Sequence, residues 1–347
     1  MRYKLLGKSG LRVSELCLGT MTFGQDWGWG ASREESRSMF DAFAEAGGNF
    51  IDTANLYTNG TSEKFVGEFL SGERSRFVVA TKYTLNTRPD DPNGGGNHRK
   101  NLVQSLEESL ERLGTDYIDL YWVHAWDPFT PIEETMRALD DAVRAGKVLY
   151  VGVSDTPAWV VSRAMTLADW RGWSAFVGLQ IPYSLIERTP ERELLPMAEA
   201  LGLTVTPWGT LGGGVITGKY KARDKRPPDT RYGSETAWGD LHLTDRNFAI
   251  ADAVAKVAVE IGRTASQVAI AWVRQRSAAI VPILGARKLL QLKDNLGCLE
   301  FELSGEQMRR LDEVSRIDLG FPLDFLEQAK GFVYGKTFPL IDGRKAA

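Results

Sequence analysis

Residues 101–124, NLVQSLEESLERLGTDYIDLYWVH, contain the pattern that decides the fold. The first thirteen residues carry apolar side chains at helical spacing, and Gly114 suits the left-handed C-terminal cap of such a helix. Residues 117–123 are then rich in aromatic and apolar residues, which is typical of a strand buried on both faces. An amphipathic helix followed by a buried strand predicts a sheet that helices cover.

The same alternation of strand and helix runs along most of the chain. Several of the other amphipathic stretches also end in glycine, at Gly47, Gly146 and Gly202. Eight βα units favour a closed (β/α)8 TIM barrel over an open sheet, and no composition shift marks a domain boundary within residues 1–347. The expected strands are ELCLG (15–19), NFIDT (49–53), FVVAT (77–81), YIDLYWV (117–123), LYVGV (149–153), AFVGL (175–179), LTVTP (203–207) and IVPIL (280–284).

Two segments fall outside this alternation. Residues 1–14, MRYKLLGKSGLRVS, alternate apolar and polar side chains around a Gly-Lys-Ser-Gly turn. They predict a β-hairpin that could plug the floor of the barrel. Residues 212–244 follow the seventh strand and are rich in loop-forming residues, and loops of this length are often functional.

Composition and charge exclude several classes of partner. A hydrophobic share of 43% and a charged share of 25% are those of a soluble globular protein. The formal net charge of -3 offers no basic field for nucleic acid, and no apolar run is long enough to span a membrane. The N-terminus lacks a signal peptide, and Cys17 and Cys298 are too few for a disulfide framework, so we expect a cytoplasmic protein. Three separated histidines predict no metal site.

Polar or aromatic side chains occupy the carboxyl ends of most of the expected strands. Active sites of (β/α)8 barrels lie at this end, so these residues are expected to converge. Asp119 lies inside the fourth strand and faces away from His124 by count, so we assign it to a structural ion pair. The strand-end residues are Asp52, Lys82, His124, Ser154, Gln180 and Trp208, and Tyr57 lies in the loop after Asp52.

Asp52, Tyr57, Lys82 and His124 make chemical sense as a group, although each alone has an ordinary structural explanation. A phenol has a pKa of about 10 and is a weak acid at neutral pH. A nearby cationic lysine lowers that pKa, and a carboxylate keeps the lysine charged and in place. A histidine can orient a carbonyl oxygen. These are the groups needed to protonate an alkoxide as it forms.

DTANLYTNGTSE (52–63), VVATK (78–82) and DLYWVH (119–124) resemble motifs of the aldo-keto reductase superfamily. The resemblance covers roughly residues 2–300 and continues through GLRVSELCLGTMTFG, VGVS, LQIPYSLIER, ITGKY and PILGARKLLQLKDNL. It implies reduction of aldehydes or ketones with NADPH, with NADH possible. It also implies roles within the tetrad: Tyr57 as general acid, Lys82 lowering the pKa of Tyr57, Asp52 pairing with Lys82, and His124 positioning the carbonyl.

The resemblance further implies a cofactor site. Ser154 and Gln180 would hydrogen-bond the nicotinamide carboxamide, Trp208 would stack on the ring, and Arg287 would take the 2′-phosphate or pyrophosphate. The full expected set is Gly19, Thr20, Met21, Asp52, Ser154, Gln180, Trp208, Gly209, Leu211, Gly213, Gly218, Lys219, Gly285, Arg287, Gln291 and Asn295.

Three local features qualify this cofactor site. No GxGxxG follows the first strand, which argues against a Rossmann domain. Residues 213–219 approach a Walker A loop, but Tyr220 occupies the position of the magnesium-binding Ser or Thr. Relatives often carry Ser-Asn after the fifth strand, whereas this chain has Ser154-Asp155, so Asp155 is left out of the cofactor set.

Trp27, Trp29, Tyr57 and Trp126 lie on loops at the expected barrel mouth and predict a flat apolar pocket for aromatic or hydrophobic carbonyl compounds. Two other functions stay open. One is a cofactor-binding regulatory or sensor subunit, since ion-channel β subunits resemble this family. The other is a Schiff-base aldolase with Lys82 as nucleophile, which requires a lowered lysine pKa. The sequence leaves the physiological substrate, the direction and the oligomeric state undetermined.

Overall fold

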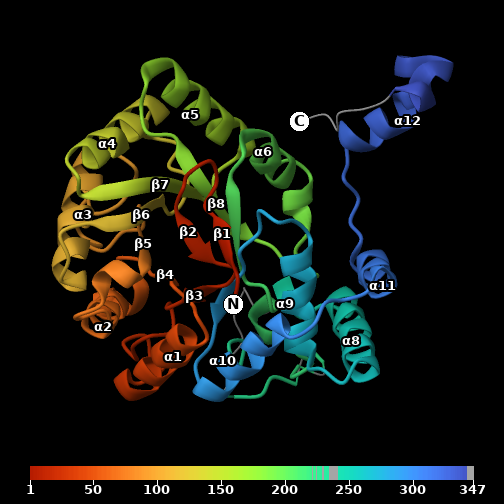
Figure 1. Cartoon of the computed structure of the whole chain (residues 1–347), viewed down its shortest axis with the longest axis horizontal. Coiled ribbons are helices and arrows are strands. Elements are labelled where there is room, and N and C mark those ends of the chain that lie inside the picture. Colours follow the sequence, from red (N-terminus) through yellow and green to blue (C-terminus); the bar gives the residue numbers. More distant parts are fainter. Residues whose placement is uncertain (221, 224, 229, 234–240, 342–347) are drawn as a thin grey trace.

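A parallel β-sheet curls into a barrel that helices surround (Figure 1). The computed structural model describes residues 1–220, 222–223, 225–228, 230–233 and 241–341, so part of the segment 212–244 lies outside the described residues. The eight parallel strands follow one another around the barrel in chain order, which confirms the predicted fold class. They are β3 (Cys17–Gly19), β4 (Phe50–Asp52), β5 (Val78–Tyr83), β6 (Ile118–Val123), β7 (Val148–Ser154), β8 (Phe176–Pro182), β9 (Thr204–Trp208) and β10 (Ile283–Gly285).

Most helices bury an apolar face against the outside of these strands. The four predicted terminal glycines, Gly47, Gly114, Gly146 and Gly202, have φ values of 87°, 60°, 73° and 69°, as left-handed caps require. The described helices are α1 (Arg33–Glu45), α2 (Thr61–Phe69), α3 (Arg99–Leu113), α4 (Ile132–Arg144), α5 (Ala158–Arg171), α6 (Leu194–Leu201), α8 (Asp245–Glu260), α9 (Ala265–Gln275), α10 (Leu289–Leu296), α11 (Gly305–Ser315) and α12 (Leu323–Tyr334).

The barrel closes between β9 and the residues that precede β10. Val281 N donates to Val205 O at 2.8 Å, and Val205 N donates to Ala279 O at 2.9 Å. These bonds join β9 to the segment that leads into β10, so these backbone groups at the seam are paired.

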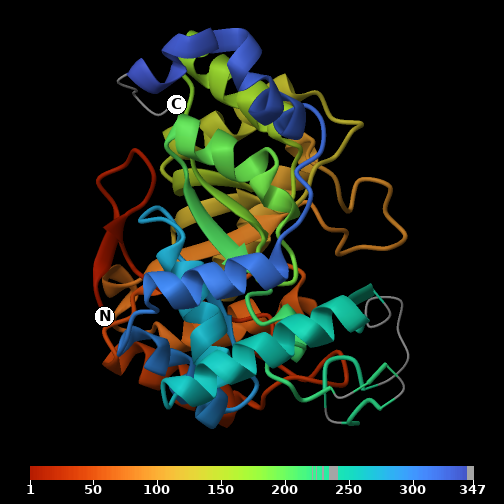
Figure 2. The ribbon, with the colours of Figure 1, turned by 90° about the vertical axis from the view of Figure 1, so that its right-hand side faces the viewer.

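The predicted hairpin forms from β1 (Tyr3–Leu5) and β2 (Arg12–Ser14) and closes the amino-terminal end of the barrel. Lys4 Nζ donates to Ile280 O at 2.6 Å, and Gly7 N donates to Thr204 Oγ1 at 2.7 Å. Gly7 has φ of 56°, and an added Cβ would lie 2.2 Å from Val177 O, so the turn requires glycine. Figure 2 shows this hairpin at the opposite end of the barrel from the long loops.

Alternate strand positions point into the barrel, and Trp122 fills much of the interior. A Cβ added at Gly152 would lie 2.3 Å from the Trp122 ring, and one added at Gly178 would lie 2.8 Å from it. These two glycines therefore make room for the indole. The inner core consists of Leu6, Val13, Cys17, Phe50, Val78, Ala80, Leu120, Trp122, Val281 and Ile283.

The same period of two orients the polar residues of the strands. Lys82 lies two residues beyond the inward-facing Ala80, and His124 lies two beyond Trp122, so both belong to the layer above the inner core. Asp119 has the opposite phase and points outward, where its Oδ2 lies 2.7 Å from Arg74 Nη2. The predicted structural ion pair is therefore confirmed. Burial raises the pKa of Asp119, and Arg74 opposes that rise.

The C-terminal helix α12 lies outside the ring of helices, beyond α6 and α11 (Figure 1). Its apolar face is uncovered, with Phe325 58% and Phe332 94% exposed. No helix among the described residues is long and apolar enough to cross a membrane.

Candidate active site

The ammonium group of Lys82 lies at the centre of the predicted tetrad. It donates to Asp52 Oδ1, to Thr53 O at 2.7 Å and to Tyr57 OH at 3.2 Å. The lysine side chain is 0% exposed, so it is not a surface lysine. All three of its N–H donors are satisfied, which compensates the cost of burying the charge.

Neighbouring strands bring these groups together. Asp52 ends β4, Lys82 lies near the end of β5, and His124 directly follows β6. Asp52 pairs with Ala80 across the first strand boundary, and Lys82 pairs with Trp122 across the second. The strand ends therefore form one continuous edge at the carboxyl end of the barrel.

The second oxygen of Asp52 is held from across the barrel. Gln180 Nε2, on β8, donates to Asp52 Oδ2 at 3.0 Å. The resemblance implies that the Gln180 side chain binds the nicotinamide carboxamide. The bond to Asp52 gives the Gln180 side-chain amide a further partner within the protein. Nothing in the local sequence around either residue signals the pairing, because 128 positions separate them.

The loop after β4 holds Tyr57 over Lys82. Tyr57 begins a 3-10 turn, η1 (Tyr57–Gly60), in which Thr58 and Asn59 have φ of 46° and 55°. This backbone conformation is unfavourable for residues other than glycine. Thr58 Oγ1 donates to Phe23 O at 2.6 Å and accepts from Ser62 N at 3.1 Å, and these bonds hold the strained turn.

The protonation states of the tetrad follow from burial and from Lys82. Burial raises the pKa of Tyr57, and although Lys82 lowers it, the net pKa stays above the ordinary value. Lys82 therefore acts on the Tyr57 pKa in the predicted direction, and burial, which the sequence does not show, outweighs it. Burial alone would lower the pKa of Lys82, but Asp52 and Tyr57 raise it above its usual value. Burial, then Lys82, lowers the pKa of His124 well below its usual value, so the imidazole is neutral. Its ring centroid lies 5.8 Å from that of Tyr57.

Ser154, Asp155 and Trp208 meet at the ends of β7 and β9. Ser154 Oγ is buried without a hydrogen bond of normal geometry. Trp208 Nε1 donates to Asp155 Oδ1 at 3.3 Å. Burial raises the pKa of Asp155 to about 6, and the Trp208 indole, the Ser154 hydroxyl and the Lys82 charge oppose the rise.

The predicted phosphate-binding residues form a second group. An added Cβ would meet nothing within 4 Å at Gly209, Gly218 or Gly285, so the backbone there is open to a ligand. Burial, and then the charge of Arg287, lower the pKa of Lys219, so these two cationic side chains lie near each other.

The remaining predicted cofactor residues lie in more closed surroundings. Thr20 is fully buried and donates to Asp52 O at 3.0 Å, and Asn295 is 3% exposed. Gln291 Oε1 accepts from Arg287 N at 2.9 Å. Gly19 and Gly213 are crowded, since an added Cβ would lie 2.6 Å from Ile283 Cγ2 and 2.4 Å from Tyr232 OH, respectively. Met21 and Leu211 are half-buried.

The predicted substrate tryptophans contact both the Tyr57 loop and Asp155. Trp27 and Trp29 pack against each other at 5.9 Å between ring centroids, and Trp27 Nε1 donates to Asn59 Oδ1 at 3.2 Å. Trp126 is 40% exposed and its backbone N donates to Asp155 O at 3.3 Å. Its ring packs edge-on against Trp159 of α5. The sequence analysis did not include Trp159 in the substrate site, because its place in a helix looks the same as that of any surface residue.

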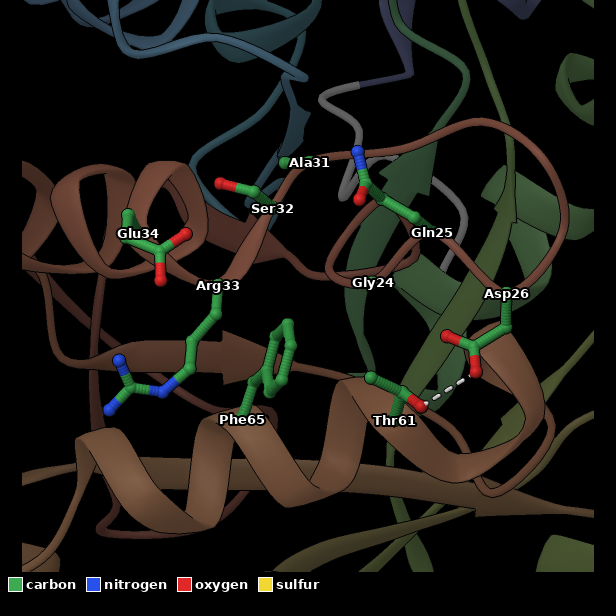
Figure 3. Close-up of a pocket in the computed structure, with 9 residues that line it drawn as sticks. All are labelled: Gly24, Gln25, Asp26, Ala31, Ser32, Arg33, Glu34, Thr61 and Phe65. Carbon is green, nitrogen blue, oxygen red and sulfur yellow. Dashed lines mark hydrogen bonds between the residues drawn. The ribbon is translucent and has the colours of Figure 1, made fainter.

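A surface hollow of about 490 Å³ lies beside this site, between the loop after β3 and the start of α2. Figure 3 shows its lining, in which Thr61 Oγ1 donates to Asp26 at 3.1 Å. It contains no tetrad residue and none of the predicted tryptophans, so it is separate from the predicted substrate site. Its lining residues are Gly24, Gln25, Asp26, Ala31, Ser32, Arg33, Glu34, Thr61 and Phe65.

Comparison with known proteins identifies the family. Residues 15–316 match the model of the aldo/keto reductase family. A putative aryl-alcohol dehydrogenase of Saccharomyces cerevisiae is 39% identical over 334 residues, covering 92% of this chain and 88% of the relative. Norsolorinic acid reductase of Aspergillus flavus is 39% identical, covering 93% and 83%. The NADP(+) aryl-alcohol dehydrogenase of Phanerodontia chrysosporium is 39% identical, covering 90% and 85%. This chain therefore belongs to the aldo/keto reductase family and is an oxidoreductase.

Proposed function

We propose that this enzyme reduces aromatic or other hydrophobic aldehydes and ketones to alcohols with NADPH. The observation that carries the proposal is the fully buried Lys82 ammonium, whose hydrogen bonds join Asp52 to the phenol of Tyr57. A carbonyl oxygen that gains negative charge needs a proton donor and a nearby positive charge, and this arrangement supplies both.

Each tetrad residue then has a defined task. A bound nicotinamide would supply a hydride to the carbonyl carbon. Tyr57 donates its proton to the carbonyl oxygen, and its raised pKa keeps the phenol protonated at neutral pH. The alkoxide is a stronger base than a phenolate, so the transfer remains favourable. Lys82 stabilises the phenolate left on Tyr57, Asp52 keeps Lys82 charged, and neutral His124 orients the carbonyl.

The residues present fit a nicotinamide dinucleotide. The buried Ser154 hydroxyl lacks a normal hydrogen bond and can take one from or give one to a carboxamide. The open backbone at Gly209, Gly218 and Gly285 allows close approach of a pyrophosphate. The charges of Lys219 and Arg287 act on each other, and an anionic phosphate would stabilise both, which supports NADPH. The name of the Phanerodontia relative, which includes NADP(+), agrees with this cofactor.

The surroundings of the tetrad support an aromatic substrate. Trp27 contacts the Tyr57 loop through Asn59 and packs against Trp29, and Trp126 contacts Asp155. Flat apolar surfaces of this kind favour flat apolar ligands. Two of the relatives are named aryl-alcohol dehydrogenases, which agrees with this class of substrate.

The test follows NADPH absorbance with a panel of aromatic aldehydes. We expect turnover by the wild type and a loss of about a thousandfold in kcat for Tyr57→Phe. Tyr83→Phe is the matched control, because Tyr83 is a buried tyrosine on β5 that stacks on Tyr121 outside the tetrad. Turnover that survives in Tyr57→Phe would refute the proton-donor role. NADPH binding without turnover would instead indicate a regulatory subunit. An aldolase is disfavoured because the pKa of Lys82 is raised.

A further inference from the structure

Asp155 is a charged residue at the site to which the proposed reaction gives no task. Its backbone has φ of 43°, a left-handed conformation that Asp and Asn tolerate better than most residues. Asp155 N donates to Gln180 O at 3.1 Å, and Asp155 O accepts from Trp126 N at 3.3 Å. These bonds to β8 and to the loop after β6 fix the turn, and the carboxylate then meets the Trp208 indole.

The carboxylate contacts a residue that the proposed function assigns to the nicotinamide site. The proposed reaction requires the ring to lie near Tyr57, which protonates the oxygen of the carbon that receives hydride. Asp155 contacts Trp208, the expected stacking partner of the ring, and its charge acts on both Tyr57 and Lys82. A carboxylate in this position acts on the ring through space.

We propose that Asp155 sets the balance between oxidised and reduced cofactor, by placing a negative charge beside a ring that is cationic only when oxidised. Alcohol oxidation breaks the carbinol C–H bond, moves the hydride to the ring and returns the hydroxyl proton to the phenolate form of Tyr57, which is the form that carbonyl reduction leaves behind. The ring loses its positive charge in this step. A neighbouring carboxylate therefore stabilises NADP+ relative to NADPH and shifts the bound equilibrium towards the oxidised cofactor. This inference rests on the proposed function.

The effect depends on the ionisation of Asp155 and hence on pH. The carboxylate is charged above its pKa of about 6 and neutral below it, so the preference for NADP+ should grow as pH rises through this value. The titratable groups that face Asp155 do not titrate in the same range. Lys82 stays charged and Tyr57 stays neutral, because the pKa of each is raised. His124 stays neutral, because its pKa is lowered.

The experiment measures the dissociation constants of NADP+ and NADPH separately, by quenching of tryptophan fluorescence, between about pH 5 and about pH 8. Both forms carry the 2′-phosphate, so its own titration cancels in the ratio of the two constants. The variants are Asp155→Asn, which removes the charge but can still accept from Trp208, and Asp155→Glu, which keeps the charge. Asp169→Asn is the matched control, since Asp169 is exposed on the outer helix α5.

We expect Asp155→Asn to reduce the preference for NADP+ by about tenfold at about pH 8 and by less than twofold at about pH 5, the size expected for one charge in a partly hydrated site. Asp155→Glu should keep the pH-dependent preference, and Asp169→Asn should match the wild type. An unchanged ratio in a folded Asp155→Asn protein that still binds both forms would refute the inference alone. Failure of the wild type to bind either form would refute the proposed function. If Asp155→Asn fails to fold, Asp155→Ser takes its place. Loss of the pH-dependent preference for NADP+ in Asp155→Ser would support the inference, and an unchanged preference would refute it.

Discussion

Replacing Asp52 by Asn tests whether the carboxylate keeps the buried lysine charged. Lys82 is fully buried, and Asp52 is the charged acceptor among its three hydrogen-bond partners. Breaking one side of a buried ion pair leaves an uncompensated charge, so we expect the free energy of unfolding to fall by about 3–5 kcal/mol at about pH 7.

The pH dependence of this loss is the diagnostic part. In the wild type the pKa of Lys82 is raised, so its contribution to stability is complete below the unfolded pKa of about 10.4 and is lost only as pH rises through the higher folded value. In Asp52→Asn, burial is no longer opposed by Asp52 and lowers the lysine pKa. The unfolded chain then binds more protons than the folded one, so stability should recover by up to about 1.4 kcal/mol per pH unit above the lowered pKa.

Denaturant unfolding at about pH 7 and about pH 9 measures this recovery. Asp119→Asn is the matched control, because Asp119 pairs with Arg74 on the outside of the same barrel and arginine does not lose its proton in this range. The stability loss of Asp119→Asn should be equal at the two pH values. If the loss of Asp52→Asn is also equal at both, the reasoning that Asp52 maintains the charge of Lys82 is refuted.

Two further substitutions test the cofactor site and the barrel interior. Ser154→Ala removes a buried hydroxyl without a normal hydrogen bond, so the free energy of unfolding should change by less than about 0.5 kcal/mol, while NADPH should bind about tenfold more weakly in a fluorescence titration. Unchanged NADPH affinity would remove Ser154 from the site. Gly152→Ala places a methyl group 2.3 Å from the Trp122 ring and should destabilise the fold by about 1–3 kcal/mol in denaturant unfolding. A stability equal to that of the wild type would show that the indole moves freely.

Much of the fold was predictable because it depends on short-range patterns. Apolar runs such as residues 117–123 and amphipathic stretches ending in a residue such as Gly114 recur along the chain, and each pattern is complete within one element. The barrel class then implies that strand-end residues converge. The strand period of two separates Lys82, which points inward, from Asp119, which points outward to Arg74.

The tertiary structure decided what depends on distances across the barrel. The bond from Gln180 to Asp52 joins β8 to β4 across the barrel, so the sequence around neither residue predicts it. The net pKa of Tyr57 is the balance between burial, which raises it, and the Lys82 charge, which lowers it, and that balance exists only once the strands enclose the phenol. Asp155 is a similar case, since the sequence marks it only as a departure from Asn. Its contact with Trp208 and its raised pKa arise because β7 and β9 end at the same site, where surrounding protein replaces water around the carboxylate.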